Sequence, residues 1–458
     1  MSFNVKRQLL GAAGAGGEPA YFFAKIETPT DADKRNCIHG VVDSSDNIYV
    51  DFDYKQSSSD YRLGLVKFDS ASNVLAQRYL SNVVYRPSQY GELFVGSWNS
   101  AFDSSDNYYI VGKGSQGNQN PVYMKINTSD LTVTSKFERE FSSGSVYSGF
   151  WSSNANAYLA GGTGFSGFGQ FGKMTSAGSN SWAKTLTMST PFGGPGVFLT
   201  GGGEDSSGNV YAVGTHPFFG YRGVLVKYNS SGTLQWATYV YQGNDNNSFY
   251  AVKCDSSDNP YVIGWMGSSG GKEIAYVAKF NSSGSKQWDY APQFDDQKSA
   301  IQSIDFDSSG NVYLAGASTE DNHSGDFGAY RSVSYYYKLN SSGTLQWQRG
   351  MSSSSASSNG SGTFGTIAID SNDDMILTSA QSTGSSSVRF YIARLPNDGT
   401  LTGTYYTAGV KYGTPSMTDK NVGGTTTAST GAGSTSFVNR TPTVADNSVT
   451  LSITTETV

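Results

Sequence analysis

Short stretches rich in apolar and aromatic residues recur along the chain, separated by clusters of Gly, Ser, Asn and Asp. Examples within one unit are NVYLAG (311–316), YYYKLN (335–340) and TLQWQRG (344–350). Short runs of aromatic and β-branched residues are typical of β-strands, and the small polar clusters are typical of the turns between them. Long runs of helix-forming residues with a helical period do not occur in the sequence. The pattern therefore predicts an all-β chain of short strands.

A turn motif, Asp-Ser-Ser-x-Asn-x-Tyr, recurs at a nearly constant interval and divides the chain into seven units. Five clear copies begin at Asp43, Asp103, Asp205, Asp255 and Asp307, and two worn copies begin at Ser152 and Asp370. Successive copies start 49 to 63 residues apart. A period of about 50 residues, with strand-like content in each unit, indicates a β-propeller rather than a helical solenoid.

A second landmark follows each turn motif at a fixed distance. A basic residue opens a short segment at Lys67, Lys125, Lys173, Lys227, Lys279, Lys338 and Arg394. Nine residues later stand Trp182, Trp236, Trp288 and Trp347 in four units, and Ala76, Thr134 and Gly403 in the others. The constant phase predicts four strands in each unit. We expect the Tyr and Trp side chains to pack between neighbouring units, because large aromatic rings bury much apolar area.

These two landmarks resemble the bacterial β-propeller repeat sometimes called SBBP, with its D-x-x-G-N-x-Y-x-x-G and K-x-N-x-x-G-x-x-x-W signatures. The resemblance covers about residues 40–405 and is closest from Asp205 to Trp347. It implies a propeller fold, and the seven phased copies predict seven four-stranded blades. Residues 21–26 (YFFAKI) read as one further strand. This strand either completes a blade with C-terminal strands or forms an extra edge.

The two ends differ from the repeats in composition. Residues 1–20 form a glycine-rich arm, in which LLGAAGAGG is too rich in glycine for the core of an export signal. Residues 21–410 form the predicted propeller. Residues 411–458 begin as a Gly, Ser and Thr linker and end in two strands around Ala445–Asp446–Asn447, which predicts a C-terminal hairpin. A lone hairpin is marginal in water, so it packs on the propeller or on another chain.

Charge and hydropathy exclude two classes of partner. The net charge is −6, and Lys and Arg do not cluster as they do on proteins that grip phosphates, so we expect no nucleic acid partner. No apolar stretch approaches the roughly 20 residues of a membrane span.

Residues that often carry chemistry are few and scattered. The Asp-Ser-Ser-Asp-Asn loops are similar to calcium loops but lack the later glycine and bidentate Glu, so we interpret them as turns closed by side-chain hydrogen bonds. We interpret acidic pairs such as Asp373–Asp374 as solvated turn residues. The remaining candidates match no metal, redox or nucleophile spacing: His39, His216, His323, Cys37, Cys254, the Gly164–Gly167 segment and Asp295–Asp296. We therefore predict no catalytic, cofactor-binding or metal-binding residues, and no enzyme activity.

Three classes of function compete. The few charges, the many Gly, Ser, Thr and Tyr residues and the two arms resemble bacteriophage tail and fibre proteins, which favours a structural or host-attachment component of a virion. Its partners would be other virion proteins, docked through the arms in an oligomeric assembly, and a host-surface receptor or glycan. The alternative is a bacterial surface or secreted adhesion or carbohydrate-binding propeller. An enzyme or lectin using the central face is the third class, but no matched acid, base and nucleophile set supports an enzyme.

Overall fold

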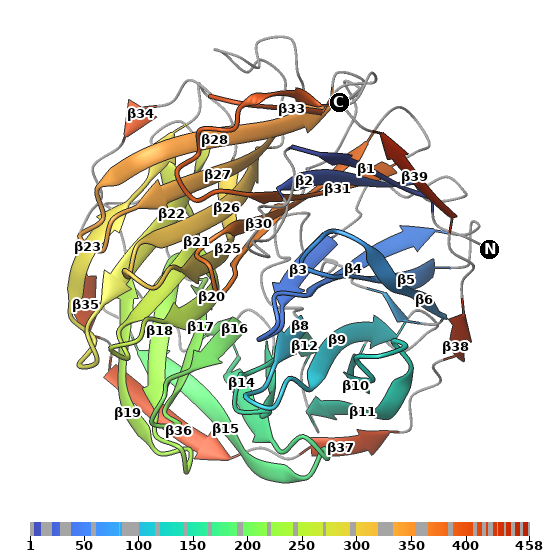
Figure 1. Cartoon of the computed structure of the whole chain (residues 1–458). Helices are drawn as coiled ribbons and strands as arrows, with labels where there is room; N and C mark the ends of the chain where they lie inside the picture. Colours follow the sequence, from blue (N-terminus) through green and yellow to red (C-terminus); the bar gives the residue numbers. More distant parts are fainter. Residues whose placement is uncertain are drawn as a thin grey trace.

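The structure is a closed ring of seven β-sheets around a central channel (Figure 1). It confirms the predicted seven-bladed all-β propeller, and the described residues contain no helix. The computed structural model describes residues 4–10, 21–27, 38–55, 61–81, 83–84, 100–114, 120–141, 145–163, 167–189, 196–217, 221–240, 246–268, 272–293, 299–318, 333–353, 365–382, 388–405, 410–414, 418–419, 425–427, 429–434, 437–440, 445–448 and 452–456.

Each blade contains four antiparallel strands, the first at the channel and the fourth at the rim. Blade 1 is β3 (Ile38–Val42), β4 (Ile48–Lys55), β5 (Tyr61–Phe68) and β6 (Val74–Ser81). Blade 2 is β8 (Ser100–Phe102), β9 (Tyr108–Gly114), β10 (Pro121–Ile126) and β11 (Val133–Phe141), with β7 (Val83–Val84) beside β9. Blade 3 is β12 (Ser145–Trp151), β13 (Ala157–Gly162), β14 (Gly169–Met174) and β15 (Asn180–Ser189).

The remaining blades repeat this order. Blade 4 is β16 (Phe198–Glu204), β17 (Val210–His216), β18 (Arg222–Tyr228) and β19 (Leu234–Val240). Blade 5 is β20 (Asn247–Cys254), β21 (Pro260–Ser268), β22 (Lys272–Phe280) and β23 (Lys286–Tyr290), followed by β24 (Pro292–Gln293). Blade 6 is β25 (Ser299–Phe306), β26 (Val312–Ser318), β27 (Val333–Leu339) and β28 (Leu345–Ser353). Blade 7 is β29 (Gly365–Ile369), β30 (Met375–Ser382), β31 (Val388–Leu395) and β2 (Phe22–Glu27).

The N-terminal strand closes the ring. Strand β2 pairs antiparallel with β31, from Phe22 opposite Arg394 to Glu27 opposite Arg389, and so becomes the fourth strand of blade 7. This decides between the two roles left open for residues 21–26. Strand β1 (Asn4–Leu9) adds to the outer edge of β2, so part of the predicted N-terminal arm belongs to the same sheet.

The C-terminal tail runs around the rim and pairs with a strand at each blade in turn (Figure 1, the orange and red strands at the rim). At blade 5 its partner is β24, and the two form a separate two-stranded sheet beside the blade. We call strands β33–β39 the belt. Strand β32 (Gly403–Tyr405) pairs with the first belt strand. The belt passes blades 6, 5, 4, 3, 2, 1 and 7 as β33 (Val410–Gly413) on β28, β34 (Thr418–Asp419) on β24, β35 (Thr425–Thr427) on β19, β36 (Ser429–Ser434) on β15, β37 (Phe437–Arg440) on β11, β38 (Ala445–Ser448) on β6 and β39 (Ser452–Glu456) on β1.

The direction of the belt explains its one parallel pairing. Belt strands on blades 1 to 6 run antiparallel to the strand they cover. On blade 7, β1 is antiparallel to β2 and already occupies the place that a belt strand has elsewhere. The last belt strand, β39, keeps the same sense around the ring and therefore pairs parallel with β1.

The belt differs from the linker and hairpin expected for residues 411–458. The strands β37, β38 and β39 pair with three different blades rather than with one another, and Ala445–Asp446–Asn447 lies in a strand instead of a turn. The outer strand of a blade leaves a row of backbone N–H and C=O groups without partners. Each short belt strand pairs with one such row, which a pattern of side chains along the sequence cannot reveal.

The repeat motif forms the tight turn that joins the first strand of each blade, at the channel, to the second strand. In blade 1, Asp43 Oδ1 accepts hydrogen bonds from the Ser45 and Asn47 amides at 3.0 and 2.9 Å, which confirms the predicted turn chemistry. The fourth motif residue has a positive φ, for example 59° at Asp46 and 76° at Gly208. Asp and Gly tolerate this left-handed conformation better than most residues.

The choice between Asp and Gly at that fourth position follows the contacts between blades. Where it is Asp, its carboxylate accepts hydrogen bonds from the amide and hydroxyl of the second motif residue of the preceding blade. Ser206 donates to Asp258 at 2.8 Å through both groups. The same contact joins Ser44 to Asp106, Ser308 to Asp373 and Ser371 to Asp46. The last of these links blade 7 to blade 1 across the closure.

The Asp, Tyr and Lys residues that recur at fixed positions of the repeat lie close together within a blade. In blade 4, Lys227 Nζ lies 3.8 Å from Asp205 Oδ2 and 5.1 Å from the centroid of the Tyr211 ring, while the Tyr211 hydroxyl donates to Asp205 at 3.4 Å. Blade 3 has Ser152 in place of the Asp, and Glu204 of blade 4 supplies the missing carboxylate to Lys173 at 3.0 Å. The motif is thus a structural cluster.

Each of the four tryptophans reaches into the next blade, as predicted. Its indole N–H donates to a carbonyl in the turn between the third and fourth strands, for example from Trp288 to Ser341 at 3.1 Å. The ring covers the glycine of that turn. The contacts are Trp182 with Gly232, Trp236 with Gly284, Trp288 with Gly343 and Trp347 with Gly399.

We predict that Gly343→Ala destabilises the protein more than Gly310→Ala. Both glycines have a positive φ, 84° and 75°, so each alanine costs about 1 kcal/mol of strain. An added Cβ at Gly343 would lie 2.6 Å from Trp288, whereas nothing lies within 4 Å of one at Gly310. The overlap costs about 1–3 kcal/mol more. Urea unfolding of both variants checks this, and equal losses would mean that the tryptophan does not hold the turn.

We also predict that removing residues 425–458 frees the rim while the ring stays closed through β2 and β31. Hydrogen exchange should then quicken at least tenfold for the amides of β15 and β19 that face the belt, because they lose their acceptors. Amides of the inner strands β13 and β17 serve as the control and should keep their protection. Unchanged exchange in β15 and β19 would contradict the belt.

Candidate functional site in the central channel

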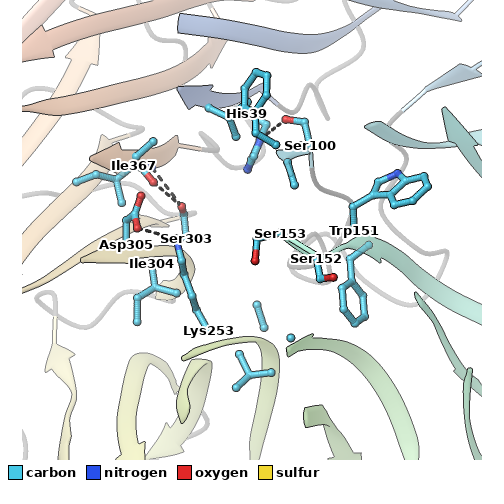
Figure 2. Close-up of a pocket in the computed structure, with 18 of the residues that line it drawn as sticks. His39, Ser100, Trp151, Ser152, Ser153, Lys253, Ser303, Ile304, Asp305 and Ile367 are labelled. Carbon is cyan, nitrogen blue, oxygen red and sulfur yellow. Dashed lines mark hydrogen bonds and ion pairs between the residues drawn. The ribbon is translucent and has the colours of Figure 1, made fainter. Parts of the chain in front are cut away.

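The first strands of all seven blades enclose a cavity of about 430 Å³. Pockets that hold small ligands commonly measure about 300–1,000 Å³. Figure 2 shows His39, Ser153, Lys253 and Asp305, from four different blades, around one opening. The cavity therefore brings together residues that lie far apart in the sequence.

Two of the charged residues stand where the repeat otherwise places small or apolar ones. The position two residues before the motif aspartate holds Val41, Ala101, Phe150, Gly203, Lys253, Asp305 and Ala368. Lys253 of β20 and Asp305 of β25 face each other across the boundary between blades 5 and 6. Their Nζ and Oδ1 atoms lie 2.6 Å apart, and 47% of the Lys253 side chain is exposed.

The carboxylate of Asp305 is held in place by more than the lysine. It accepts hydrogen bonds from the Phe306 amide at 2.9 Å and from the Ile369 amide of blade 7 at 3.0 Å. With Lys253 as a third donor, Asp305 is well satisfied and fixed. The lysine ammonium has three N–H donors and donates one hydrogen bond to Asp305, so the other two N–H groups can face the channel.

His39 of β3 is the second polar feature of the channel wall. Its Nδ1 lies 2.7 Å from the Ser100 hydroxyl oxygen, which donates to Asp51 Oδ1 at 2.7 Å. The Tyr108 hydroxyl also donates to Asp51 at 3.0 Å. The side chain of Asp51 is fully buried. Since the single hydroxyl proton of Ser100 goes to the carboxylate, Ser100 accepts from His39 Nδ1–H, and His39 Nε2 is left as a hydrogen-bond acceptor.

The environment keeps the imidazole neutral. Burial lowers the pKa of His39 below its usual 6.5, and the nearby Lys253 lowers it further, while the Asp51 and Asp305 carboxylates oppose the change. A His whose folded pKa is below 6.5 is uncharged at pH 7. The wall thus combines one neutral acceptor with one ion pair.

Asp51 also departs from the repeat. Its position, eight residues after the motif aspartate, is occupied in the other blades by Val111, Ala160, Val213, Ile263, Ala315 and Thr378. A buried carboxylate among apolar equivalents is costly unless it is hydrogen-bonded, as it is here. Aligning the seven copies with one another would have drawn attention to Asp51, Lys253 and Asp305. The prediction of no site residues rests on known motif spacings, which these single-copy departures from the repeat do not match.

Of the other candidates, Cys254 lines the channel cavity beside Lys253, whereas His216 does not. His216 ends strand β17 and is fully buried, and the free thiol of Cys254 ends β20, where burial raises its pKa. The reading of Asp373–Asp374 as solvated is wrong for Asp374, which is buried and paired with Arg394 at 3.4 Å. Outside the described residues lie Cys37, His323, Asp295–Asp296 and most of Gly164–Gly167.

Two features are absent from the described ranges. Among them, no group of three or more His, Cys, Asp and Glu residues is arranged to hold a metal ion. Nor does this part of the chain contain a helix that is long and apolar enough to span a membrane.

Known proteins are similar to this chain only distantly. No protein-family model matches the chain, and no curated protein matches it. Among solved structures it is similar to a quinohemoprotein alcohol dehydrogenase from Comamonas testosteroni, with 9% identity over 87% of this chain and 78% of the other and a TM-score of 0.40.

Two other solved structures are similar at the same level. One is an ulvan lyase from a new family of polysaccharide lyases, with 10% identity, 83% and 88% coverage of this chain and the other, and a TM-score of 0.36. The other is the WD40 domain of SCAP from fission yeast, with 10% identity, 82% and 99% coverage and a TM-score of 0.38. Similarity at this level carries no argument about this chain.

We predict that His39 titrates with a pKa below 6.5 in the folded protein. Burial disfavours its charged form, so the imidazole should stay neutral down to a pH below 6.5. NMR titration of the ring protons, assigned by comparison with a His39→Gln variant, measures this. The Asp51→Asn variant should lower the pKa further, since it removes the one negative charge that is hydrogen-bonded to Ser100. A value above 6.5 in the wild type would contradict the geometry.

Proposed function

We propose that the chain is a non-enzymatic structural component of a bacteriophage virion, in a tail, fibre or host-attachment position. The observation that carries this proposal is the belt. The ring is closed once by β2 on β31 and again by a tail that crosses all seven blades and ends on β1. Such a double closure suits a protein that must stay folded on a particle for long periods.

The double closure would act on the rate of unfolding. Opening the ring between blades 7 and 1 requires β2 to leave β31, and the belt holds the neighbouring rims together while this happens. Interactions that must all break before unfolding can proceed slow the unfolding rate. The belt also pairs with the outer strands of blades 1, 2, 3, 4 and 6, so the edge that these blades offer to other chains is the outward edge of the belt.

The proposal also concerns how the chain would meet its neighbours. The N- and C-terminal strands lie side by side on blade 7, as β1 and β39. We therefore propose that other virion proteins dock along the outward edge of β39 and the belt, by strand addition. The blade turns and the channel mouth would face away from that contact and be displayed.

The polar network of the channel supports a role without catalysis. In a nucleophilic triad the histidine lies between the serine and the carboxylate, and it removes the serine proton. Here Ser100 lies between His39 and Asp51 and gives its proton to the carboxylate. Ser100 is also buried. The arrangement orients His39 rather than activating Ser100.

Quantitative mass spectrometry of purified phage particles from the source culture tests the proposal. We expect the chain at a fixed copy number per particle, with gold-labelled antibodies against the propeller decorating one part of the particle by electron microscopy. The alternative is a surface or secreted adhesion protein of a bacterium. Recovery of the chain only from host envelopes or culture medium would support that alternative and exclude the virion role.

A further inference from the structure

We propose that the central channel binds an uncharged, hydroxyl-rich ligand of one or two sugar rings, between His39, Lys253 and Ser153. This inference goes beyond the structural role and holds for either location of the protein. It rests on the cavity of about 430 Å³ and on the polar groups at its wall, of which Lys253 and its partner Asp305 depart from the repeat.

The three groups offer complementary hydrogen bonds from separate blades. His39 Nε2 presents a lone pair, because Nδ1–H is engaged by Ser100 at 2.7 Å. Lys253 is about half exposed and keeps N–H donors beyond its bond to Asp305. Ser153 is exposed at the same opening, and its hydroxyl can donate or accept (Figure 2). A vicinal diol, which both donates and accepts at adjacent positions, satisfies such a mixed set.

Charge decides against the ionic alternatives. The positive charge of Lys253 is offset by Asp305 at 2.6 Å, so the pair offers little net attraction to an anion. An anion would also meet the lone pair of His39, which stays unprotonated at neutral pH. A cation would meet Lys253. An uncharged ligand avoids both costs and still replaces water at every polar group.

The rigidity of these groups favours binding. Asp51, through Ser100, fixes the imidazole, and the backbone amides of Phe306 and Ile369 fix Asp305 and with it the lysine. A site that is already ordered loses little entropy when it binds. Burying the Asp51 carboxylate costs free energy, and the equivalent position of five other blades is apolar. Its role in orienting His39 accounts for that cost.

Calorimetric titration of the full-length protein at pH 7 tests the inference with ligands matched in ring shape and different in charge. The panel is glucose, glucuronic acid and glucosamine, the same three forms of galactose, and the neutral disaccharides maltose, lactose and cellobiose. We expect at least one neutral sugar to bind saturably, and its acidic and amino counterparts to bind at least about tenfold more weakly.

Two channel variants and one control locate the site. Lys253→Met and His39→Phe should each weaken binding of that sugar at least about tenfold, the loss of a hydrogen bond to a group in the channel. Lys286→Met is the matched control, because Lys286 also pairs with an Asp, Asp289, but on the outer strand β23. It should bind like the wild type. Thermal unfolding of each variant checks that it is folded.

Three results would overturn the inference: no neutral sugar of the panel binds, the acidic form binds more tightly than the neutral one, or Lys253→Met and Lys286→Met behave alike. None of these results bears on the presence of the chain in virions, which the particle analysis measures separately. The two proposals can therefore fail independently.

Discussion

The pairing of β2 with β31 is the interaction on which the rest of the structure depends. Every blade buries both faces of its middle strands against neighbouring blades, so a ring with one missing partner would leave two sheet faces in water. Phe22, Phe23, Ala24 and Ile26 of β2 are fully buried, in two hydrophobic clusters that include residues of blades 1 and 6. A strand from one end of the chain thus completes a sheet begun at the other end. The belt, the turn contacts and the channel all require this closure.

The repeated residues hold the blades to one another. The motif aspartate, tyrosine and lysine form a cluster inside a blade. The serine that directly follows the motif aspartate reaches an aspartate of the next blade, and the tryptophan covers a glycine turn of the next blade. Where one member of a cluster changes, another compensates. In blade 7 an isoleucine, Ile376, replaces the tyrosine, and Arg394 replaces the lysine and pairs with both Asp370 and Asp374. The residues that recur in each unit therefore serve the packing within and between blades.

Residues that depart from the repeat do not serve the contacts that recur in every blade. Lys253 and Asp305 occupy positions that are small or apolar in the other blades, and together with His39 they line the channel. Asp51, at a position that is apolar in five other blades, lies buried behind the wall and reaches His39 through Ser100. A closed ring gives each blade the same packing, so a charge present in a single copy serves no repeated contact. This is the physical reason to assign these residues to a ligand rather than to the fold, and a reason to compare repeats internally when relatives are lacking.

By itself, the sequence determined the all-β class, the seven blades, the turn chemistry and the contact of tryptophan with the next blade. These depend on short apolar and aromatic stretches bounded by turn residues and on a longer period of about 50, and both are visible along the chain. Only the tertiary structure decided that residues 22–27 close blade 7, that the tail forms a belt instead of a hairpin, and that His39 faces Lys253. Those contacts join segments of different blades through backbone pairing or through the curvature of the ring. A row of backbone donors pairs with almost any extended segment, so no side-chain pattern marks its partner.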